Sequence, residues 1–393
     1  MDLRNIFLRH VAQTSPAPLL TQIVKARGMY LHTADGQQIL DLISGIGVSA
    51  LGHCHPAIVH AVQSQAEKYL HTMVYGEFVL SPQVQLAKKL VDLLPSSLDS
   101  VYFVNSGAEA VEGALKLAKK ITGRYEIVAC RNAYHGSTHG AMSLMSSEIY
   151  TGPFRPLLPM VRFIDYNEPV QLDTITDQTA AVIMETVQAE SGIHPPENNY
   201  LVKVQNRCKE TGSLFILDEI QCAYGRTGHF FAFEKYDVVP DILLLAKGMG
   251  GGMPIGAFVS SQENMSKLAN SPALGHITTF GGHPVNCAAA LATLEVIDSE
   301  KLIKGLPTKI DLFRQHLPHP YIQEIREGGL WFALDLGDAQ LLQRVVREAA
   351  DEGLLIDWFL FNDHSLRVAP PLIISPDEII KACKILHHIL DRC

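Results

Sequence analysis

Two short apolar runs, each ending in one charged residue, constrain this chain most. Residues 242–246 read ILLLA and lead into Lys247 and a glycine-rich loop, and residues 213–217 read SLFIL and lead into Asp218. Runs of this kind are typical of strands buried on both faces of a parallel sheet. A charge at the end of such a strand is costly to desolvate, so it must be paired, neutralised or used chemically. The pattern predicts a site at the edge of an open α/β sheet, with Lys247 as a candidate amine nucleophile.

Composition restricts the class of protein. The chain has 393 residues, is 47% hydrophobic and 19% charged, and suits a large two-domain globular enzyme. Its net charge of −9 argues against nucleic acid or an anionic membrane surface as a partner and favours a small-molecule substrate. Seven cysteines without a CxxC pair are typical of a reduced intracellular protein, and no apolar run is long enough to span a bilayer. We therefore expect a cytoplasmic protein.

Short apolar runs alternate with helical periods through the middle of the chain. The spacing predicts a mostly parallel sheet with helices between its strands. The first and last parts differ, with a hairpin pattern over 29–42 and helices around the segments 328–336 and 365–368. We expect a large domain over 56–295 and one small domain assembled from 1–55 and 296–393. The expected strands of the large domain are 100–104, 127–130, 180–185, 214–217, 242–246 and 255–260.

Two segments are candidates for binding a phosphate. Ser106, Gly107 and Ala108 lie where a predicted strand turns into a helix, and backbone N–H groups at a helix N-terminus attract anions. The alternative is an ordinary strand-to-helix turn with a serine N-cap. Thr278 and Thr279 form the second candidate, with an ordinary polar turn as the alternative. Neither segment matches a nucleotide-binding motif, so nucleotide binding is not favoured.

Tyr134 and His135 follow another predicted strand, and an aromatic ring there either stacks on a planar ligand or fills the core. A lysine amine, a buried carboxylate, an anion cradle and an aromatic plate are together what pyridoxal 5′-phosphate requires. One cofactor accounts for all four features. The segment His53-Cys54-His55 looks like a metal cluster, but its ligands would have to converge from one short loop, so we expect no metal site.

Eight motifs in order resemble the class III pyridoxal-phosphate-dependent aminotransferases of fold type I, and most of all the acetylornithine and ornithine aminotransferase branch. The resemblance implies a large domain with a mostly parallel seven-stranded sheet and a small α+β domain built from both termini. The motifs are DLISGIGVSALGHCHPAI (41–58), FVNSGAEAVEGALKLA (103–118), AYHG (133–136), ETVQAESG (185–192), LDEIQCAYGRTG (217–228), PDILLLAKGMGGGMPIGA (240–257), TTFGGHPVNCAAAL (278–291) and LRVAPPL (366–372).

The resemblance also implies roles for single residues. Lys247 would form the Schiff base with the cofactor and move a proton, and Asp218 would keep the pyridine nitrogen protonated. Thr279 would reach the phosphate of a partner subunit, which implies a homodimer with shared active sites. The remaining cofactor-binding residues would be Ser106, Gly107 and Ala108 at the phosphate, Tyr134 and His135 at the ring, and Gln221 at the phenolic oxygen.

Substrate recognition is implied at four positions. Arg367 matches an arginine that grips an α-carboxylate, and Glu190 matches a glutamate that pairs with it when an ω-amine is bound. The alternatives are a structural ion pair for Arg367 and a solvated loop acid for Glu190. Thr278 would lie near the substrate. Ser137 stands where relatives usually carry a second carboxylate-binding arginine, and a hydroxyl cannot replace that bidentate contact.

The sequence thus predicts an aminotransferase that works by a ping-pong cycle. An ω-amine or amino acid, of the acetylornithine or 4-aminobutyrate kind, would donate its amino group, and a 2-oxo acid such as 2-oxoglutarate or pyruvate would accept it. Two alternatives stay open: an aminomutase or racemase of the same fold, and a non-catalytic module that binds the cofactor.

Overall fold

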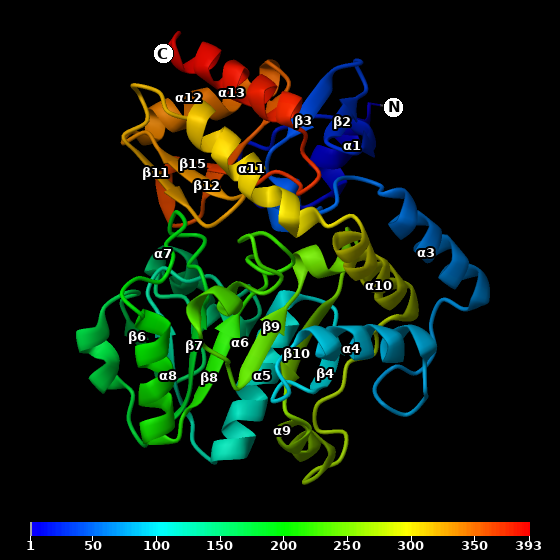
Figure 1. Cartoon of the computed structure of the whole chain (residues 1–393), viewed down its shortest axis with the longest axis vertical. Helices are drawn as coiled ribbons and strands as arrows, with labels where there is room; N and C mark the ends of the chain where they lie inside the picture. The colour runs from blue at the N-terminus through cyan, green and yellow to red at the C-terminus, as the bar shows by residue number, and fades with distance from the viewer. Residues whose placement is uncertain (1) are drawn as a thin grey trace.

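A seven-stranded sheet forms the centre of the larger lobe in the computed structural model, which describes residues 2–393 (Figure 1). The strand order is β4-β10-β9-β8-β7-β5-β6, and only β10 runs antiparallel to its neighbours. The predicted α/β class with a mostly parallel sheet is confirmed. The strands are β4 (Ser100–Val104), β5 (Glu126–Cys130), β6 (Val161–Ile164), β7 (Thr179–Glu185), β8 (Leu214–Asp218), β9 (Ile242–Leu245) and β10 (Gly256–Ser260).

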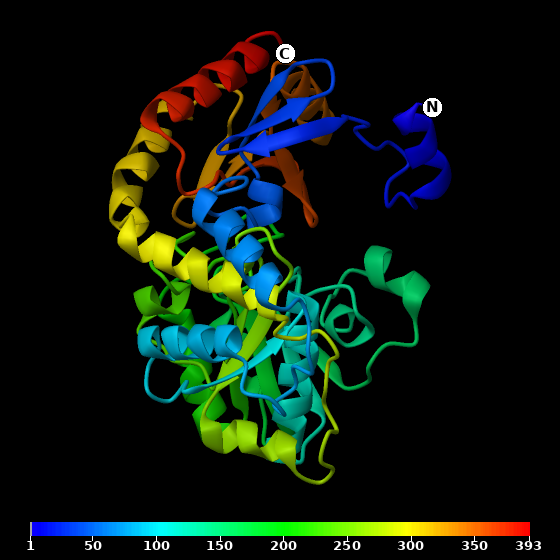
Figure 2. The same cartoon turned by 90° about the vertical axis from the view of Figure 1, so that its right-hand side faces the viewer.

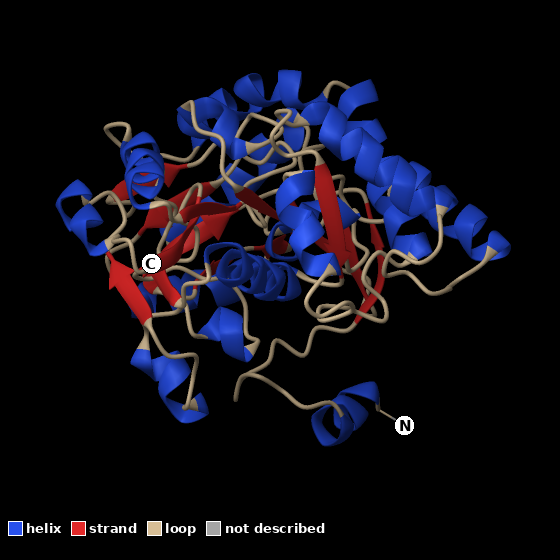
Figure 3. Ribbon diagram, turned by 90° about the horizontal axis from the view of Figure 1, so that it is seen from below, coloured by secondary structure: helices blue, strands red, loops and turns tan. Residues whose placement is uncertain are grey.

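Both faces of this sheet are covered by helices, as seen from below in Figure 3. Side chains alternate along a strand, so Ala181 and Ile183 of β7 pack with α5 on one face, and Val182 and Met184 belong to the core on the other. Burial on both faces explains why the strands read as continuous apolar runs. The helices of this lobe are α3 (Pro56–Lys68), α4 (Ser81–Leu93), α5 (Gly107–Thr122), α6 (His139–Met142), α7 (Glu148–Thr151), α8 (Tyr200–Thr211), α9 (Gln262–Ser266) and α10 (Pro284–Ser299).

The smaller lobe holds two four-stranded sheets, of order β1-β2-β3-β13 and β11-β12-β15-β14. Strand β3 from the N-terminal part pairs in parallel with β13 from the C-terminal part, with Leu40 opposite Leu354. The segments 328–336 and 365–368 contain strands of the second sheet. The strands are β1 (Ile23–Arg27), β2 (Tyr30–Thr33), β3 (Gln38–Asp41), β11 (Glu324–Glu327), β12 (Phe332–Asp335), β13 (Leu354–Leu355), β14 (Asp357–Phe359) and β15 (Asn362–Val368).

Three long helices, α11 (Leu302–His316), α12 (Ala339–Asp351) and α13 (Pro376–Leu390), belong to the smaller lobe, which has its own apolar core. Helix α10 continues through residue 295, so the predicted boundary at that residue falls inside a helix. The domain limits stay a prediction. Within residues 2–393, no helix is both long and apolar enough to cross a membrane.

The N-terminal end of the chain stands apart from the rest. Helix α1 (Leu3–His10) projects away from the smaller lobe and buries none of its residues (Figure 2). Residues 44–47 form a short turn, α2 (Ser44–Gly47), ahead of the His53 segment. His53 Nε2 lies 2.8 Å from Asp41 Oδ2, and Cys54 is exposed.

Candidate active site

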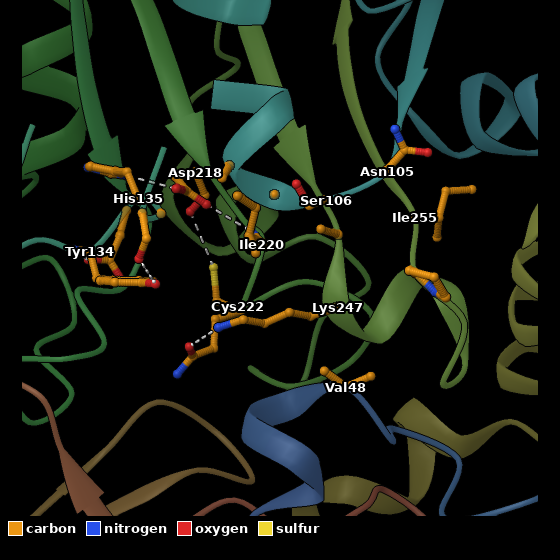
Figure 4. Close-up of a pocket in the computed structure, with 18 of the residues that line it drawn as sticks. Val48, Asn105, Ser106, Tyr134, His135, Asp218, Ile220, Cys222, Lys247 and Ile255 are labelled. Atoms are coloured by element: carbon orange, nitrogen blue, oxygen red, sulfur yellow. Dashed lines mark hydrogen bonds and ion pairs between the residues drawn. The ribbon is translucent and has the colours of Figure 1, made fainter. Parts of the chain in front are cut away.

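A cavity of about 480 Å³ lies at the carboxyl ends of the central strands (Figure 4). Ligands of open α/β sheets bind at this edge, and the volume is ordinary for a small-molecule site. The structure brings nine predicted site residues to its wall: Ser106, Gly107, Ala108, Tyr134, His135, Ser137, Asp218, Gln221 and Lys247.

Lys247 follows β9 and extends its side chain into this cavity (Figure 4). Its backbone has φ of 47°, a left-handed conformation that is rare for a residue with a side chain and that occurs often at functional sites. The ammonium donates a hydrogen bond to Gln221 Oε1. Burial lowers the pKa of Lys247, and the carboxylate of Glu190 opposes that shift. A lowered pKa increases the fraction of uncharged amine, which is the nucleophilic form.

Asp218 ends β8 and is almost completely buried, with 4% of its surface exposed. Its Oδ1 accepts a hydrogen bond of 2.9 Å from the amide of Ile220, and its Oδ2 lies 2.7 Å from Nδ1 of His135. Burial by itself lowers the pKa of His135, but the hydrogen bond and charge of Asp218 raise it overall. Within residues 2–393, the buried Nε2 of His135 has no hydrogen-bond partner. The carboxylate is thus oriented from two sides and borders the cavity.

The turn from β4 to α5 forms a concave backbone surface. Ser106 caps α5, and its Oγ accepts a hydrogen bond of 3.2 Å from the amide of Glu109. No acceptor within residues 2–393 takes the amide hydrogens of Gly107 and Ala108. A Cβ on Gly107 would lie only 2.7 Å from Cδ1 of Ile220, so a larger residue here would have to displace the Ile220 side chain that also lines the cavity. Free amides at the N-terminus of a sixteen-residue helix suit a phosphate group.

Tyr134 and Ser137 form the opposite part of the wall. The Tyr134 hydroxyl lies 3.1 Å from Oγ of Ser137. The Tyr134 amide donates a hydrogen bond of 3.1 Å to Oε1 of Glu185, which fixes the loop that carries the ring. The aromatic plate and the serine therefore lie together at the mouth of the site.

Glu185 is a site residue that sequence reasoning missed. It ends β7, lines the cavity and accepts a second hydrogen bond of 2.9 Å from the amide of Ala189. Burial raises its pKa to about 7. Its position at the end of an apolar strand, like that of Asp218, is the sequence signal that could have identified it. Glu185 ties the Tyr134 loop to the segment that leads to Glu190.

Glu190 and Arg367 form a bidentate ion pair beside the cavity rather than in its wall. The guanidinium donates hydrogen bonds of 3.0 and 2.8 Å to the two carboxylate oxygens. Both side chains are buried, with exposed fractions of 3% for Arg367 and 8% for Glu190. Burial raises the pKa of Glu190, but the charges of Arg367 and Lys247 outweigh it and leave the pKa lowered. Gln221 connects the pair to the cavity, because it lines the cavity wall and its Nε2 lies 3.5 Å from Oε1 of Glu190.

Thr278 and Thr279 lie elsewhere. The hydroxyl of Thr278 accepts a hydrogen bond of 2.7 Å from the amide of Gly281 and lines a separate cavity beside β4. The carbonyl oxygen of Thr279 lies 2.8 Å from Nε2 of His71. Neither threonine lines the cavity that contains Lys247 of the same chain.

Comparison with known proteins decides the family. The model of the family described as Aminotransferase class-III matches residues 11–390. The chain belongs to the class-III aminotransferases. This class-III aminotransferase is a pyridoxal-phosphate-dependent transaminase, as the sequence predicted.

Curated relatives and solved structures agree with that assignment. The acetylornithine aminotransferase of Methanocaldococcus jannaschii is 41% identical over 91% of this chain and 90% of the relative. That of Archaeoglobus fulgidus is 36% identical over 96% of this chain and 97% of the relative. The ornithine aminotransferase structure from Toxoplasma gondii has a TM-score of 0.91 at 30% identity, covering 99% of this chain and 93% of that one.

The residues of this class-III aminotransferase fit pyridoxal 5′-phosphate. The donor set offers free amides at the start of α5 for a phosphate, a buried carboxylate for a ring nitrogen, an aromatic face and an amine. Each group faces the same cavity from a different element of the larger lobe. The arrangement can hold the cofactor by its phosphate and ring while leaving Lys247 free to exchange protons with a substrate.

Proposed function

We propose that this aminotransferase moves an amino group from an ω-amine or amino acid to a 2-oxo acid, such as 2-oxoglutarate or pyruvate, by a ping-pong mechanism. The observation that carries the proposal is the buried ion pair of Glu190 and Arg367 beside the Lys247 cavity. An enzyme that alternates between an ω-amine without an α-carboxylate and a 2-oxo acid with one needs a carboxylate-binding group that is covered for the first and uncovered for the second.

The chemistry divides among the residues of the cavity. When bound, pyridoxal 5′-phosphate supplies an electron sink for the carbon that carries the amine. In this proposal, Lys247 attaches the cofactor and then acts as the base and acid that moves the substrate proton, which its lowered pKa supports. Asp218, oriented by His135, holds the proton of the ring nitrogen. Ser106, Gly107 and Ala108 bind the phosphate, and Tyr134 covers the ring.

Arg367 binds the α-carboxylate of an amino acid or 2-oxo acid in this mechanism. Its planar guanidinium already holds one carboxylate in the bidentate geometry that a substrate would use. Glu190 occupies that place when the substrate is an ω-amine without an α-carboxylate. Replacing one carboxylate by another keeps the buried charge paired, which makes the exchange energetically acceptable.

Ser137 limits the donors that we propose. Among the described residues that line the cavity, Lys247 is the single Lys or Arg. A carboxylate at the far end of a donor therefore meets the hydroxyl of Ser137 and not a guanidinium. We infer that the preferred donor lacks a second carboxylate at that position, although the relatives named above are acetylornithine and ornithine aminotransferases.

We also propose a homodimer with active sites at the subunit interface, working in the cytoplasm. Thr278 and Thr279 do not reach the cavity of their own chain, and the surface near them exposes large apolar side chains. All seven cysteines are free, in keeping with a reducing compartment. Light scattering on the purified protein tests the dimer. The exposed apolar side chains are Leu70 (60%), Phe78 (55%), Val79 (91%), Ile277 (47%) and Phe280 (56%).

The deciding experiment is a panel of ω-amines, amino acids and diamines, each paired with 2-oxoglutarate or pyruvate and followed as formation of the new amino acid. An aminotransferase forms glutamate or alanine in proportion to donor consumed. An aminomutase or racemase instead converts the donor into its isomer without consuming a 2-oxo acid. A non-catalytic module leaves every donor unchanged, and either of these results would contradict the proposal.

A further inference from the structure

Asp357 is an acid that the proposed mechanism does not use, and it lies directly opposite Arg367. Strand β14 is the edge strand of its sheet, and its antiparallel pairing with β15 places Asp357 in register with Arg367. Residues directly opposite each other in an antiparallel pair point to the same face. Oδ1 of Asp357 lies 3.3 Å from Nε of Arg367. The guanidinium therefore lies between two carboxylates, those of Glu190 and Asp357.

Strand β14 makes contacts of its own with Arg367, one of them through the nitrogen Nη2 that also bonds Glu190. Besides the ion pair with Asp357, one terminal nitrogen of the guanidinium donates a hydrogen bond of 2.7 Å to the carbonyl oxygen of Trp358. The ring of Phe359 lies 4.7 Å from the guanidinium carbon, within the range of a cation–π contact. Three consecutive residues of one strand thus hold the cation independently of Glu190.

The same hairpin also holds Glu190. The amide of Leu360 donates a hydrogen bond of 3.0 Å to Oε2 of Glu190, and the amide of Phe361 donates one of 2.9 Å to its backbone oxygen. A movement of the Glu190 side chain therefore breaks its bonds to Arg367 and Leu360. The contacts between β14 and Arg367 do not depend on that movement.

The charge of Asp357 matters because the Arg367 guanidinium beside it is buried. Only 3% of the Arg367 side chain and 20% of the Asp357 side chain are exposed. Burial raises the pKa of Asp357 to about 7, although the charge of Arg367 opposes that shift, so Asp357 pairs with Arg367 as an anion above that pH. A buried guanidinium without a counter-charge is strongly destabilised. While Glu190 leaves and a substrate carboxylate enters, Asp357 is the acid that remains paired with Arg367. While Glu190 is in place, the Leu360 amide anchors it and its two bonds hold the guanidinium. An incoming substrate carboxylate instead meets a guanidinium held by β14 alone, so the loss of Asp357 weakens the binding of that carboxylate selectively.

We propose that Asp357 is a positioning residue that keeps Arg367 in place and charge-balanced while Glu190 and a substrate carboxylate exchange. The inference rests on the proposed function and deepens it, since Asp357 then determines how well α-carboxylate substrates are used. Substrates that leave Glu190 on Arg367, such as simple ω-amines, do not depend on Asp357.

The test compares single-turnover half-reactions of the wild-type holoenzyme and the Asp357→Asn variant. L-Glutamate and L-alanine are the α-carboxylate probes, and 1-aminobutane and 1,4-diaminobutane are the ω-amine probes. In the variant we expect the half-saturating concentration of the amino acids to rise roughly 5- to 30-fold, with a limiting rate within about twofold of wild type. The values for both amines stay within about twofold. Asp357→Glu, which keeps the charge, restores part of the amino acid affinity.

Asp335→Asn is the matched control. Asp335 lies in the same sheet, and its Oδ2 lies 3.3 Å from the guanidinium of Arg326, the same separation as in the Asp357 pair. We expect this control to lower thermal stability without a selective effect on either substrate class. An equal change for both classes in Asp357→Asn, or no change for either, would overturn the inference.

Two further outcomes keep the test decisive. If Asp357→Asn fails to fold, Asp357→Glu carries the comparison and must show the same selective rise at a smaller size, and its absence overturns the inference. If the wild-type enzyme converts none of the four probes, the proposed function fails together with the role of Asp357. That result is seen before any variant is compared, so the two failures are distinguishable.

Discussion

Glu185 and Asp218 are direct register partners at the ends of two adjacent parallel strands, β7 and β8. Two buried carboxyl groups therefore border one cavity, with His135 bonded to Asp218. Burial disfavours the ionised form of Glu185, and the negative charge of the neighbouring Asp218 disfavours it further. The site thus contains one carboxyl group bonded to a histidine and one, Glu185, whose pKa is raised to about 7.

This raised pKa predicts a pH-dependent stability. Between the ordinary value of 4.5 and about 7, Glu185 holds its proton in the folded protein and loses it in the unfolded chain, so its contribution to stability falls as pH rises. In Glu185→Gln this contribution is absent. The unfolding free energy of the variant minus that of wild type should therefore rise by at most about 1.4 kcal/mol per pH unit across that window. Chemical denaturation at several pH values measures it, and a constant difference would contradict the assignment.

Lys247→Ala should abolish turnover, because no other amine lines the cavity among the described residues to attach the cofactor and move the proton. We expect a loss of at least about 10³-fold in rate. The cofactor should still bind non-covalently through the phosphate and ring contacts, which absorbance after gel filtration measures. Lys309→Ala is the control, since burial also lowers the pKa of Lys309 but it lies outside the cavity. Near-normal turnover of Lys247→Ala would refute the role of this lysine.

Glu190→Ala should free Arg367 to bind α-carboxylates at all times. We expect a faster half-reaction with glutamate or alanine and a slower one with ω-amines, measured by single-turnover kinetics. The exposed acid Glu197, replaced by alanine, serves as the control. If both half-reactions slow equally, Glu190 supports its loop and does not act as a switch.

Ser137→Arg should create a contact for a distal carboxylate. A charge-assisted hydrogen bond contributes about 1.5 to 3 kcal/mol, so donors with a carboxylate at that end should gain a corresponding advantage in kcat/KM over donors without one. Ser137→Gln lengthens the side chain without adding charge and separates the two effects. An equal change in both variants would mean that size, and not charge, governs this part of the cavity.

Sequence patterns predicted the central sheet well where strands are buried on both faces. Strand β6 was missed because it is an edge strand of four residues with partly exposed side chains and a central arginine, Arg162. The phosphate turn and the residues at strand ends could be placed because a parallel sheet brings such ends to one edge.

Other parts of the site depend on contacts that no local pattern encodes. Glu185 reads as the last residue of a strand, and only the fold shows its bonds to two loops. Asp357 lies in a strand of three residues whose pairing partner, Arg367, follows a turn. The roles assigned to Thr278 and Thr279 stay predictions, because they concern a second subunit.

The amine and the guanidinium of this enzyme belong to separate sheets. Lys247 follows β9 of the central sheet, whereas Arg367 is carried by β15 of a sheet in the smaller lobe. Mutations in the β14–β15 hairpin can therefore retune which molecules are accepted without altering the strands that hold the cofactor. Because of this division, substrate specificity can evolve through successive mutations in the smaller lobe while the residues that bind the cofactor and transfer the proton stay unchanged.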